Sequence, residues 1–316
     1  MWGLVRGQAN PRVRWLRRLL GDVQLVQGDL LDQGSLISAV ERAQPDEIYN
    51  LAAMSYVPLS WHQAELNGEV TGQGVLRLLE AIRVCSGIGS SRTPGPGQIK
   101  FYQASSSEMF GQVRESPQTI DTPFHPRSPY GVGKAYGHFL TQNYRESYGM
   151  YAVSGILFNH ESPRRGAEFV TRKVSLGAAR IKLGLERELR LGNLAARRDW
   201  GFAGDYVRAM QLMLSQDEPE DHVVGTGVTH TVQDLVEQAF GAAGLDWRDH
   251  VVCDAAYIRP AEVDHLCADP ARALERLGWE AKTTFEELIG MMVESDVELL
   301  SKAGDEVGDY LSGEAW

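Results

Sequence analysis

The stretch IKFYQASSSEMFG, Ile99 to Gly111, decides how the chain folds. Its first part is a short run typical of a buried strand. Three serines and then a glutamate, Glu108, follow at the end of that run. Because open α/β sheets bind their ligands at the carboxyl ends of parallel strands, this polar run marks a candidate site.

The same alternation of short apolar runs and helical patterns fills the N-terminal half. Strands are predicted at 23–29, 46–53, 99–106 and 151–158, with a further strand end at 1–7. Apolar residues at helical spacing predict helices at 33–44, 72–85 and 128–149. Strand–helix alternation of this kind predicts an α/β fold, a Rossmann-like doubly wound parallel sheet with helices on both faces.

The character of the sequence changes after Asn159, where polar and basic loops alternate with helical patterns at 232–244 and 270–279. We therefore predict a dinucleotide-binding domain at 1–158 and a smaller, mostly helical substrate domain at 159–316, with some chain crossing back to the sheet. The stretch before Val23 does not contain the unit with which a dinucleotide-binding sheet should open, a strand followed by a glycine-rich turn and a helix. We expect about 30 residues, one βα step, to be missing, so that the chain begins late or is a fragment.

Composition and cysteine and histidine spacing argue against several classes of protein and of site. The formal net charge of −11 argues against a nucleic acid or an acidic membrane as partner. No apolar run approaches the ~18 residues of a membrane span, and the N-terminus does not resemble a signal peptide. Three cysteines without a metal or redox spacing indicate reduced thiols, and the histidines show no metal-ligand spacing. We therefore expect a cytoplasmic protein without a metal.

The sequence YGVGK places Tyr130 and Lys134 four residues apart, on one face of a helix. A lysine ammonium near a phenol favours the phenolate, which could accept a proton from a sugar hydroxyl during hydride transfer. Alone this pair is a weak signal. Ser106 ends a strand upstream, and in an extended chain Glu108 would point to the same side as Ser106. These four residues are predicted to converge at the ligand end of the sheet.

A basic stretch follows in FNHESPRRGAEFVTRKV, Phe158 to Val174. In a protein of net charge −11, these cations suit a diphosphate, because arginine offers forked donors and lysine a point charge. The alternative is a set of solvated loops and salt bridges. The cations of the stretch are Arg164, Arg165, Arg172 and Lys173.

With these stretches considered together, the sequence resembles the extended short-chain dehydrogenase/reductase superfamily and, more narrowly, the GDP-mannose 4,6-dehydratases. The blocks GDLLD, YNLAAMSYVPLSW, FYQASSSEMFG, SPYGVGKAYGH, RDWGFAGDYV and YIRPAEVD stand in the family's order. The block NHESPRRGAEFVTRK is highly specific. The likeness runs from Trp2 to about Ala303.

The resemblance implies a role for each matching position. The catalytic positions are Ser106, Glu108, Tyr130 and Lys134, with Ser106 in place of the family's usual threonine. Further cofactor contacts are Arg6, Asp29, Leu30, Leu51, Ala52, Ala53, Met54, Ser55, His160 and Arg165. Positions that hold the nucleotide sugar are Ser60, Asn159, Lys173, Arg198, Arg259 and Glu262. Arg6 is the residue left to bind the 2′-phosphate of NADP. Gly7 and Gln8 depart from the family's pattern, in which a basic pair is followed by serine.

The implied reaction converts GDP-α-D-mannose to GDP-4-dehydro-6-deoxy-D-mannose and water, the first step toward deoxysugars such as GDP-fucose, by internal hydride transfer through NADP. Tyr130 would act in oxidation at C4, and Glu108 in the loss of water across C5 and C6. The resemblance also implies a homodimer or homotetramer. Alternatives are an epimerase or another nucleotide-sugar dehydratase of the superfamily, and a non-catalytic fragment.

Overall fold

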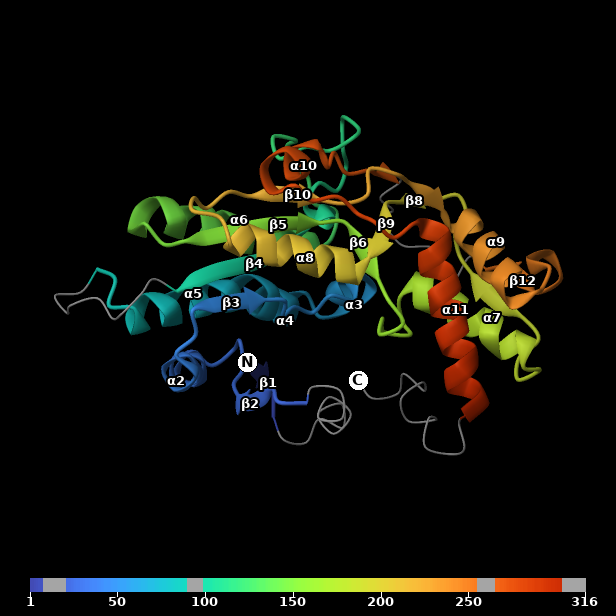
Figure 1. Ribbon diagram of the computed structural model, residues 1–316, viewed down its shortest axis with the longest axis horizontal. Coiled ribbons are helices and arrows are strands. Elements are labelled where there is room, and N and C mark those ends of the chain that lie inside the picture. The colour runs from blue at the N-terminus through green and yellow to red at the C-terminus, as the bar shows by residue number, and fades with distance from the viewer. Residues whose placement is uncertain (8–20, 90–98, 255–264, 303–316) are drawn as a thin grey trace. The chain divides into compact units, whose positions relative to one another are not determined.

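The computed structural model describes residues 1–7, 21–89, 99–254 and 265–302 (Figure 1). The chain forms two compact units that interleave along the sequence. The first unit joins Met1–Met109, Ser128–Gly155 and Met213–Asp221. The second joins Phe110–Arg127, Ile156–Leu212 and His222–Trp316. Both units thus draw chain from either side of residue 158, and the single division expected there stays a prediction.

Parallel strands form the centre of the first unit, as the sequence predicts (Figure 1). β1 and β2 pair in parallel, and β3 pairs in parallel with β4, which lies between β3 and β5. In the part of the chain that the structure describes, β1 and β2 form a sheet of their own. The bounds are β1 (Trp2–Val5), β2 (Gln24–Gln27), β3 (Glu47–Asn50), β4 (Lys100–Ser106) and β5 (Ala152–Leu157).

The helices of the first unit include the three that the sequence predicts, at α2, α5 and α6. The apolar faces of α2 and α5 are buried in a common core with Phe101 of β4. A run of short helices before α5 has no counterpart in the sequence prediction. The bounds are α2 (Gln33–Ala43), α3 (Val57–His62), α4 (Ala64–Asn67), the π-helix η1 (Gly68–Gln73), α5 (Gly74–Cys85) and α6 (Pro129–Tyr148).

Local chemistry fixes where α6 begins and how closely it packs. Ser128 caps the helix, since its Oγ accepts the N–H of Gly131 at 3.0 Å, and Pro129 stands in the first turn. Further along, a Cβ on Gly137 would lie 2.8 Å from Val75 Cγ2. Glycine therefore lets α6 pack directly on α5.

A short piece of chain from much later in the sequence, Met213–Asp221, completes the first unit. Arg145 of α6 forms an ion pair with Asp221 at 2.8 Å. Lys100 and Tyr151 donate hydrogen bonds to backbone carbonyls of the same segment. The N–H of Ser154 in β5 donates to Asp221 at 2.6 Å, so the segment is attached to β4, β5 and α6.

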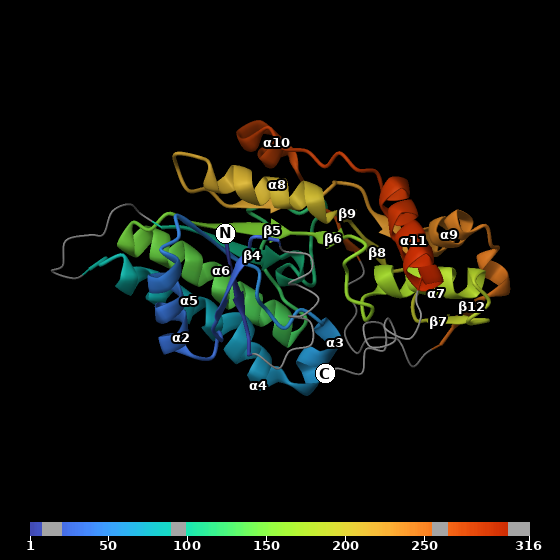
Figure 2. The ribbon, with the colours of Figure 1, turned by 60° about the horizontal axis from the view of Figure 1, so that its bottom comes forward.

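The second unit builds its core from three helices, α7, α9 and α11, which Figure 2 shows side by side. The sequence predicts α9 and α10, and both are confirmed. None of the helices within the described ranges is long and apolar enough to cross a membrane. The helix bounds are α7 (Val170–Lys182), α8 (Ala203–Leu214), α9 (Val232–Ala243), α10 (Ala271–Leu277) and α11 (Phe285–Lys302).

Short strands accompany these helices. β6 pairs in parallel with β9, β7 with β12, and β8 lies between β11 and β13. In addition, the N–H of Phe158, just after β5, donates to the carbonyl of Val224. The bounds are β6 (Asn159–Glu161), β7 (Leu189–Leu191), β8 (Arg197–Arg198), β9 (Trp200–Phe202), β10 (His222–Val224), β11 (His230–Thr231), β12 (Val251–Cys253) and β13 (His265–Leu266).

Candidate active site

The carboxyl end of β4 carries the serines and the glutamate. β4 ends at Ser106, and a single 3₁₀ turn, Ser107–Met109, follows. The expectation that Glu108 continues an extended strand is therefore wrong, because the turn replaces the alternation of sides. The turn still brings the two residues together, since the N–H of Glu108 donates to Ser106 Oγ at 3.2 Å. Both remain partly accessible between buried neighbours.

The first turns of α6 supply the tyrosine and the lysine. Lys134 is buried, and its Nζ donates to the carbonyl of Ala104 in β4 at 2.7 Å. The same Nζ lies 5.7 Å from the ring centroid of Tyr130. Burial lowers the pKa of Lys134 to about 8. Because α6 packs against both β4 and the turn after it, the four predicted catalytic residues lie on three adjoining elements.

Two buried residues that the sequence analysis did not select support this arrangement. Ser105 Oγ and His138 Nδ1 lie 3.1 Å apart, which joins β4 to α6 one turn beyond Lys134. Burial lowers the pKa of His138. His138 follows Lys134 by four positions, so the helical periodicity that pairs Tyr130 with Lys134 also places His138 on that face.

The segment Leu51–Ser55 follows β3 and is fixed by polar side chains. Asn50 Oδ1 and Thr71 Oγ1 each accept one of its N–H groups, and Asn67 donates to one of its carbonyls. Leu51 is nevertheless 56% exposed. A fixed backbone with an exposed apolar side chain at a strand's carboxyl end suits a ligand lying along it.

The ends of β1 and β2 hold the remaining cofactor candidates of the first unit. Arg6 follows β1 and is exposed, and Asp29 follows β2, where its Oδ1 accepts the N–H of Leu31. A cation, a carboxylate and the segment after β3 thus stand at successive strand ends, a donor set that fits a dinucleotide.

Two predicted residues of the first unit are buried instead. The side chain of Leu30 belongs to the apolar core. Ser60 is fully buried, and its Oγ donates to the carbonyl of Val57 at 2.7 Å.

In the second unit, three predicted residues lie in and after β6. Asn159 pairs with Trp200 of β9. His160 Nδ1 lies 2.9 Å from the carbonyl of Phe158, and its ring stacks on Tyr206 at 5.0 Å between centroids. Arg165 forms an ion pair with the buried Glu161 at 3.1 Å. Burial raises the pKa of Glu161, although Arg165 opposes the shift.

The other predicted substrate residues lie on α7 and β8. Lys173 is half-buried, and burial lowers its pKa. Arg198 is 8% exposed and donates from Nη1 to the carbonyl of Arg197 at 2.7 Å. Arg259 and Glu262 lie outside the described residues.

Arg172 does not take the role that the sequence analysis considers for it. Its side chain is 2% exposed and lies 2.5 Å from Asp296 of α11. A guanidinium that is buried against a carboxylate is not accessible to a diphosphate, so the alternative reading, a salt bridge, is correct here. Asp296 stands far along the chain, and no local pattern in the sequence indicates the pairing.

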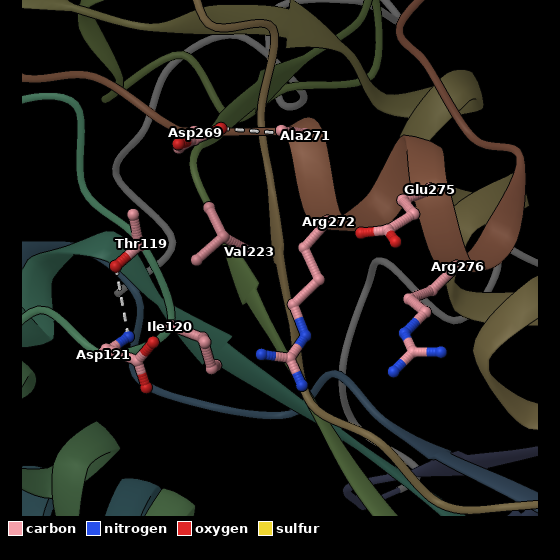
Figure 3. A pocket seen from close by; sticks show the side chains of 9 residues that line it. All are labelled: Thr119, Ile120, Asp121, Val223, Asp269, Ala271, Arg272, Glu275 and Arg276. Carbon is pink, nitrogen blue, oxygen red and sulfur yellow. Dashed lines mark hydrogen bonds between the residues drawn. The ribbon is translucent and has the colours of Figure 1, made fainter.

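A cavity of about 400 Å³ opens in the second unit (Figure 3). Figure 3 shows Arg272 and Arg276 extending from the same side of α10, with Glu275 beside them. The lining also includes Asp121 and Asp269, so opposite charges are mixed. None of the lining residues belongs to the predicted site. Across the described ranges, no group of three or more histidine, cysteine or acidic residues is placed to hold a metal ion.

Comparison with known proteins gives a family for this arrangement. Residues 1–292 match the family model of GDP-mannose 4,6 dehydratase. The chain is 49% identical over 308 residues to GDP-mannose 4,6 dehydratase 1 of Arabidopsis thaliana, covering 95% of this chain and 83% of that protein. It is 47% identical over 297 residues to the Homo sapiens GDP-mannose 4,6 dehydratase, covering 89% and 78%.

Solved structures of similar fold include RMD from Pseudomonas aeruginosa complexed with NADPH, with a TM-score of 0.78 and 24% identity over 94% of this chain and 99% of that one. A Thermus thermophilus UDP-glucose 4-epimerase in complex with NAD has a TM-score of 0.75 at 26% identity, over 94% and 99%. These structures show the fold, and the family model and the sequence relatives show that the chain belongs to the GDP-mannose 4,6-dehydratase family.

Proposed function

We propose that this chain is a hydro-lyase that converts GDP-α-D-mannose to GDP-4-dehydro-6-deoxy-D-mannose and water. One observation carries the assignment. Glu108 stands beside Ser106 at the end of β4, on an element that packs against the helix of Tyr130 and Lys134. Oxidation of a sugar alcohol needs one base, whereas elimination of water needs a second acid–base group, and Glu108 supplies it.

Residues of α6 and β4 carry out the first half of the reaction, which is oxidation at C4. Tyr130, as phenolate, accepts the proton of the mannose 4-hydroxyl, and Ser106 hydrogen-bonds the same oxygen. Lys134, fixed by the carbonyl of Ala104, favours the phenolate through its positive charge. A nicotinamide cofactor, when bound, supplies a reversible hydride store, so that oxidation at C4 and reduction at C6 cancel.

The second half belongs to Glu108. A ketone at C4 makes the proton on C5 acidic, and the Glu108 carboxylate removes it. The same group, now protonated, gives its proton to the C6 hydroxyl as that oxygen leaves as water. When C6 is reduced, C5 takes the proton that Tyr130 accepted, so that the protons balance. The hydrogen bond from the Glu108 N–H to Ser106 Oγ holds the group proposed for elimination next to a group proposed for oxidation.

We assign NADP as the cofactor. Arg6, Asp29 and the segment Leu51–Ser55 would hold it at the strand ends of the first unit. We also assign cofactor contacts to His160 and Arg165. The exposed guanidinium of Arg6 supports NADP, because arginine binds a 2′-phosphate well. The neighbour from Pseudomonas aeruginosa, solved with NADPH, agrees with this choice.

We assign GDP-mannose binding to Asn159, Lys173, Arg198, Arg259 and Glu262. Cations among these residues would hold the diphosphate against the net charge of −11. Arg198 is fixed in a three-stranded sheet, which supports a site of defined geometry.

We also propose that the protein is a homodimer or homotetramer. Val132, Tyr136 and Phe139 lie on one face of α6 and are 56%, 40% and 56% exposed. An apolar stripe of this kind on a helix surface is typical of an interface between copies.

We place the enzyme in the cytoplasm. The three cysteines, Cys85, Cys253 and Cys267, are free thiols. Unpaired cysteines suit a reducing compartment.

Incubation of the purified protein with GDP-mannose and NADP⁺ tests the proposal. We expect a product lighter than the substrate by one water, detected by mass spectrometry, with no net reduction of the cofactor. The variant Tyr130→Phe should lose this product while remaining folded. Unchanged GDP-mannose after incubation with protein that binds NADP⁺ would contradict the assignment.

A further inference from the structure

Arg172 of α7 and Asp296 of α11 form an ion pair in the core of the second unit. Nη2 of Arg172 lies 2.5 Å from Oδ1 of Asp296, and the side chains are 2% and 0% exposed. Ser175 Oγ donates to the other carboxylate oxygen at 2.6 Å. Buried pairs of this kind add little net stability, because the cost of removing two charges from water offsets their attraction. Burial indeed raises the pKa of Asp296 to about 6 despite Arg172.

The other terminal nitrogen of Arg172, Nη1, indicates that the pair positions a neighbouring segment. Nη1 donates to the backbone carbonyl of Pro163 and, at 3.4 Å, approaches that of Arg165. The guanidinium is planar and rigid, so fixing one nitrogen fixes the direction of the other. Asp296 therefore sets the orientation in which Arg172 holds the segment 162–167.

That segment presents arginines on a backbone without regular structure. Arg164 is exposed, and its N–H donates to Ser162 Oγ. Arg165 is anchored from the opposite flank, where Glu161 pairs with its Nε and Phe169 lies 3.5 Å beneath its guanidinium. Two buried acids, one on each flank, thus fix a short segment that carries two cations. Phosphate groups are bound well by arginines held in this way.

We propose that Asp296 is a positioning residue that acts through Arg172 and preorganises the segment 162–167 to bind a phosphate-bearing ligand. The identification of that ligand as NADP rests on the proposed function. Preorganisation affects affinity because a segment that is already ordered loses less conformational entropy when the ligand binds. Asp296 itself touches neither ligand nor reacting atoms.

The double substitution Arg172→Met/Asp296→Leu separates positioning from stability. Exchanging a buried ion pair for apolar residues of similar volume leaves stability near its original value, yet removes the donors to the segment. We expect amide hydrogen exchange at 162–167 to accelerate about tenfold and the Kd for NADPH to rise about tenfold, with kcat at saturating cofactor unchanged. Arg172→Lys, which keeps the charge and a single donor point, should recover part of the affinity.

Lys182→Met is the matched control, because Lys182 lies on the same helix at an exposed position. It should leave both measurements unchanged. The proposal is overturned if exchange at 162–167 does not change in the double variant, or if exchange accelerates while NADPH affinity stays the same. Wild-type protein that binds no NADPH would instead overturn the proposed function, and the exchange measurement alone would then decide the positioning role.

Discussion

At the scale of single residues, Lys134 carries the strongest electrostatic constraint in the candidate site. Its ammonium is buried between α6 and β4 with one carbonyl as acceptor. Folding lowers its pKa from 10.5 to about 8. The unfolded chain therefore binds more protons than the folded chain between these values, so this group makes the free energy of unfolding rise with pH there.

The substitution Lys134→Met should remove that rise. We expect the wild type to gain roughly 1–3 kcal/mol of stability between pH 8 and pH 10.5 from this group, and the variant to gain none of it. Urea unfolding at the two pH values measures the difference. Lys182→Met, at an exposed position on α7, is the control and should keep the wild-type slope. An identical pH dependence in Lys134→Met and wild type would refute the assignment.

The proposed role of Glu108 is in elimination and not in oxidation, and a substitution there tests it. In Glu108→Gln we expect dehydration to fall about 10²–10⁴-fold, because a general acid–base group is lost. Oxidation at C4 should persist, and reduced nicotinamide should then accumulate as an absorbance signal. Glu146→Gln, an exposed carboxylate on α6, should turn over normally. Full dehydratase activity in Glu108→Gln would assign the elimination to another group.

Residues differ in how far the sequence alone predicts their roles. Glu108 is recognisable because it follows a strand directly, where local order predicts a ligand site. The partner of Arg172 cannot be recognised in the sequence, because Asp296 contacts Arg172 only through the packing of α7 on α11. Local sequence shows the charge of an arginine but not the long-range contact that decides whether it meets solvent or a buried acid.

At the scale of elements, the start of α6 sets the position of Tyr130, the proposed catalytic base. Ser128 caps the helix, so Tyr130 lies in its first turn. A shift of one residue in this start would rotate Tyr130 by about 100° around the helix axis. The cap is therefore part of the geometry of the site.

Removing the cap tests this link. Ser128→Ala should lower the free energy of unfolding by about 1 kcal/mol, because the N–H of Gly131 loses its acceptor, and kcat should fall as well. Ser128→Asp supplies another capping oxygen and should restore both. Ser147→Ala, exposed near the other end of α6, is the control. Equal stability and kcat in Ser128→Ala and wild type would show that the cap is dispensable.

The elements themselves are largely predictable, because apolar periodicity follows burial on one face. The prediction is correct for β4, α5 and α6, where that periodicity is sustained. It fails at 57–73, where α3, α4 and the π-helix η1 follow one another. There buried polar residues such as Asn67 and Thr71 hydrogen-bond the segment after β3, so the stretch has no clean apolar stripe.

At the scale of the whole molecule, Asp199 joins distant pieces of the second unit. It is fully buried, and its two oxygens accept hydrogen bonds from the N–H and hydroxyl of Thr226 and from the N–H groups of Gly227 and Ala268. These donors come from two places in the chain, 226–227 and 268, which meet at Asp199 just after β8. Asp199 thereby supports the strand that carries Arg198.

Asp199→Asn should destabilise the protein by about 2–3 kcal/mol. An amide has one accepting oxygen in place of two, so at least one buried N–H loses its partner. Chemical denaturation measures the loss, and Asp217→Asn, at an exposed position, serves as the control. A free energy of unfolding equal to that of the wild type would show that water or a rearranged backbone replaces the missing acceptor.

The exposed stripe on α6 predicts how copies associate. Val132→Ser/Phe139→Ser should halve the solution mass, to one chain from a dimer or to two chains from a tetramer, since the substitutions place hydroxyls in an apolar interface. Sedimentation equilibrium measures this mass. Val228→Ser, an equally exposed valine in the second unit, should leave the assembly intact. A monomeric wild type, or an unaltered mass in the double variant, would place the interface elsewhere or remove it.

The late segment Met213–Asp221 has a consequence for how the protein is made on the ribosome. Domains that occupy one continuous stretch of chain fold as synthesis passes their end. Here the first unit cannot be completed until Asp221 is available to pair with Arg145. By then α7 and α8, which lie between these two residues in the sequence, have already been translated. The first unit, which carries Glu108 and Lys134, therefore stays incomplete until Asp221 has been translated, so we expect nascent chains halted earlier to bind chaperones.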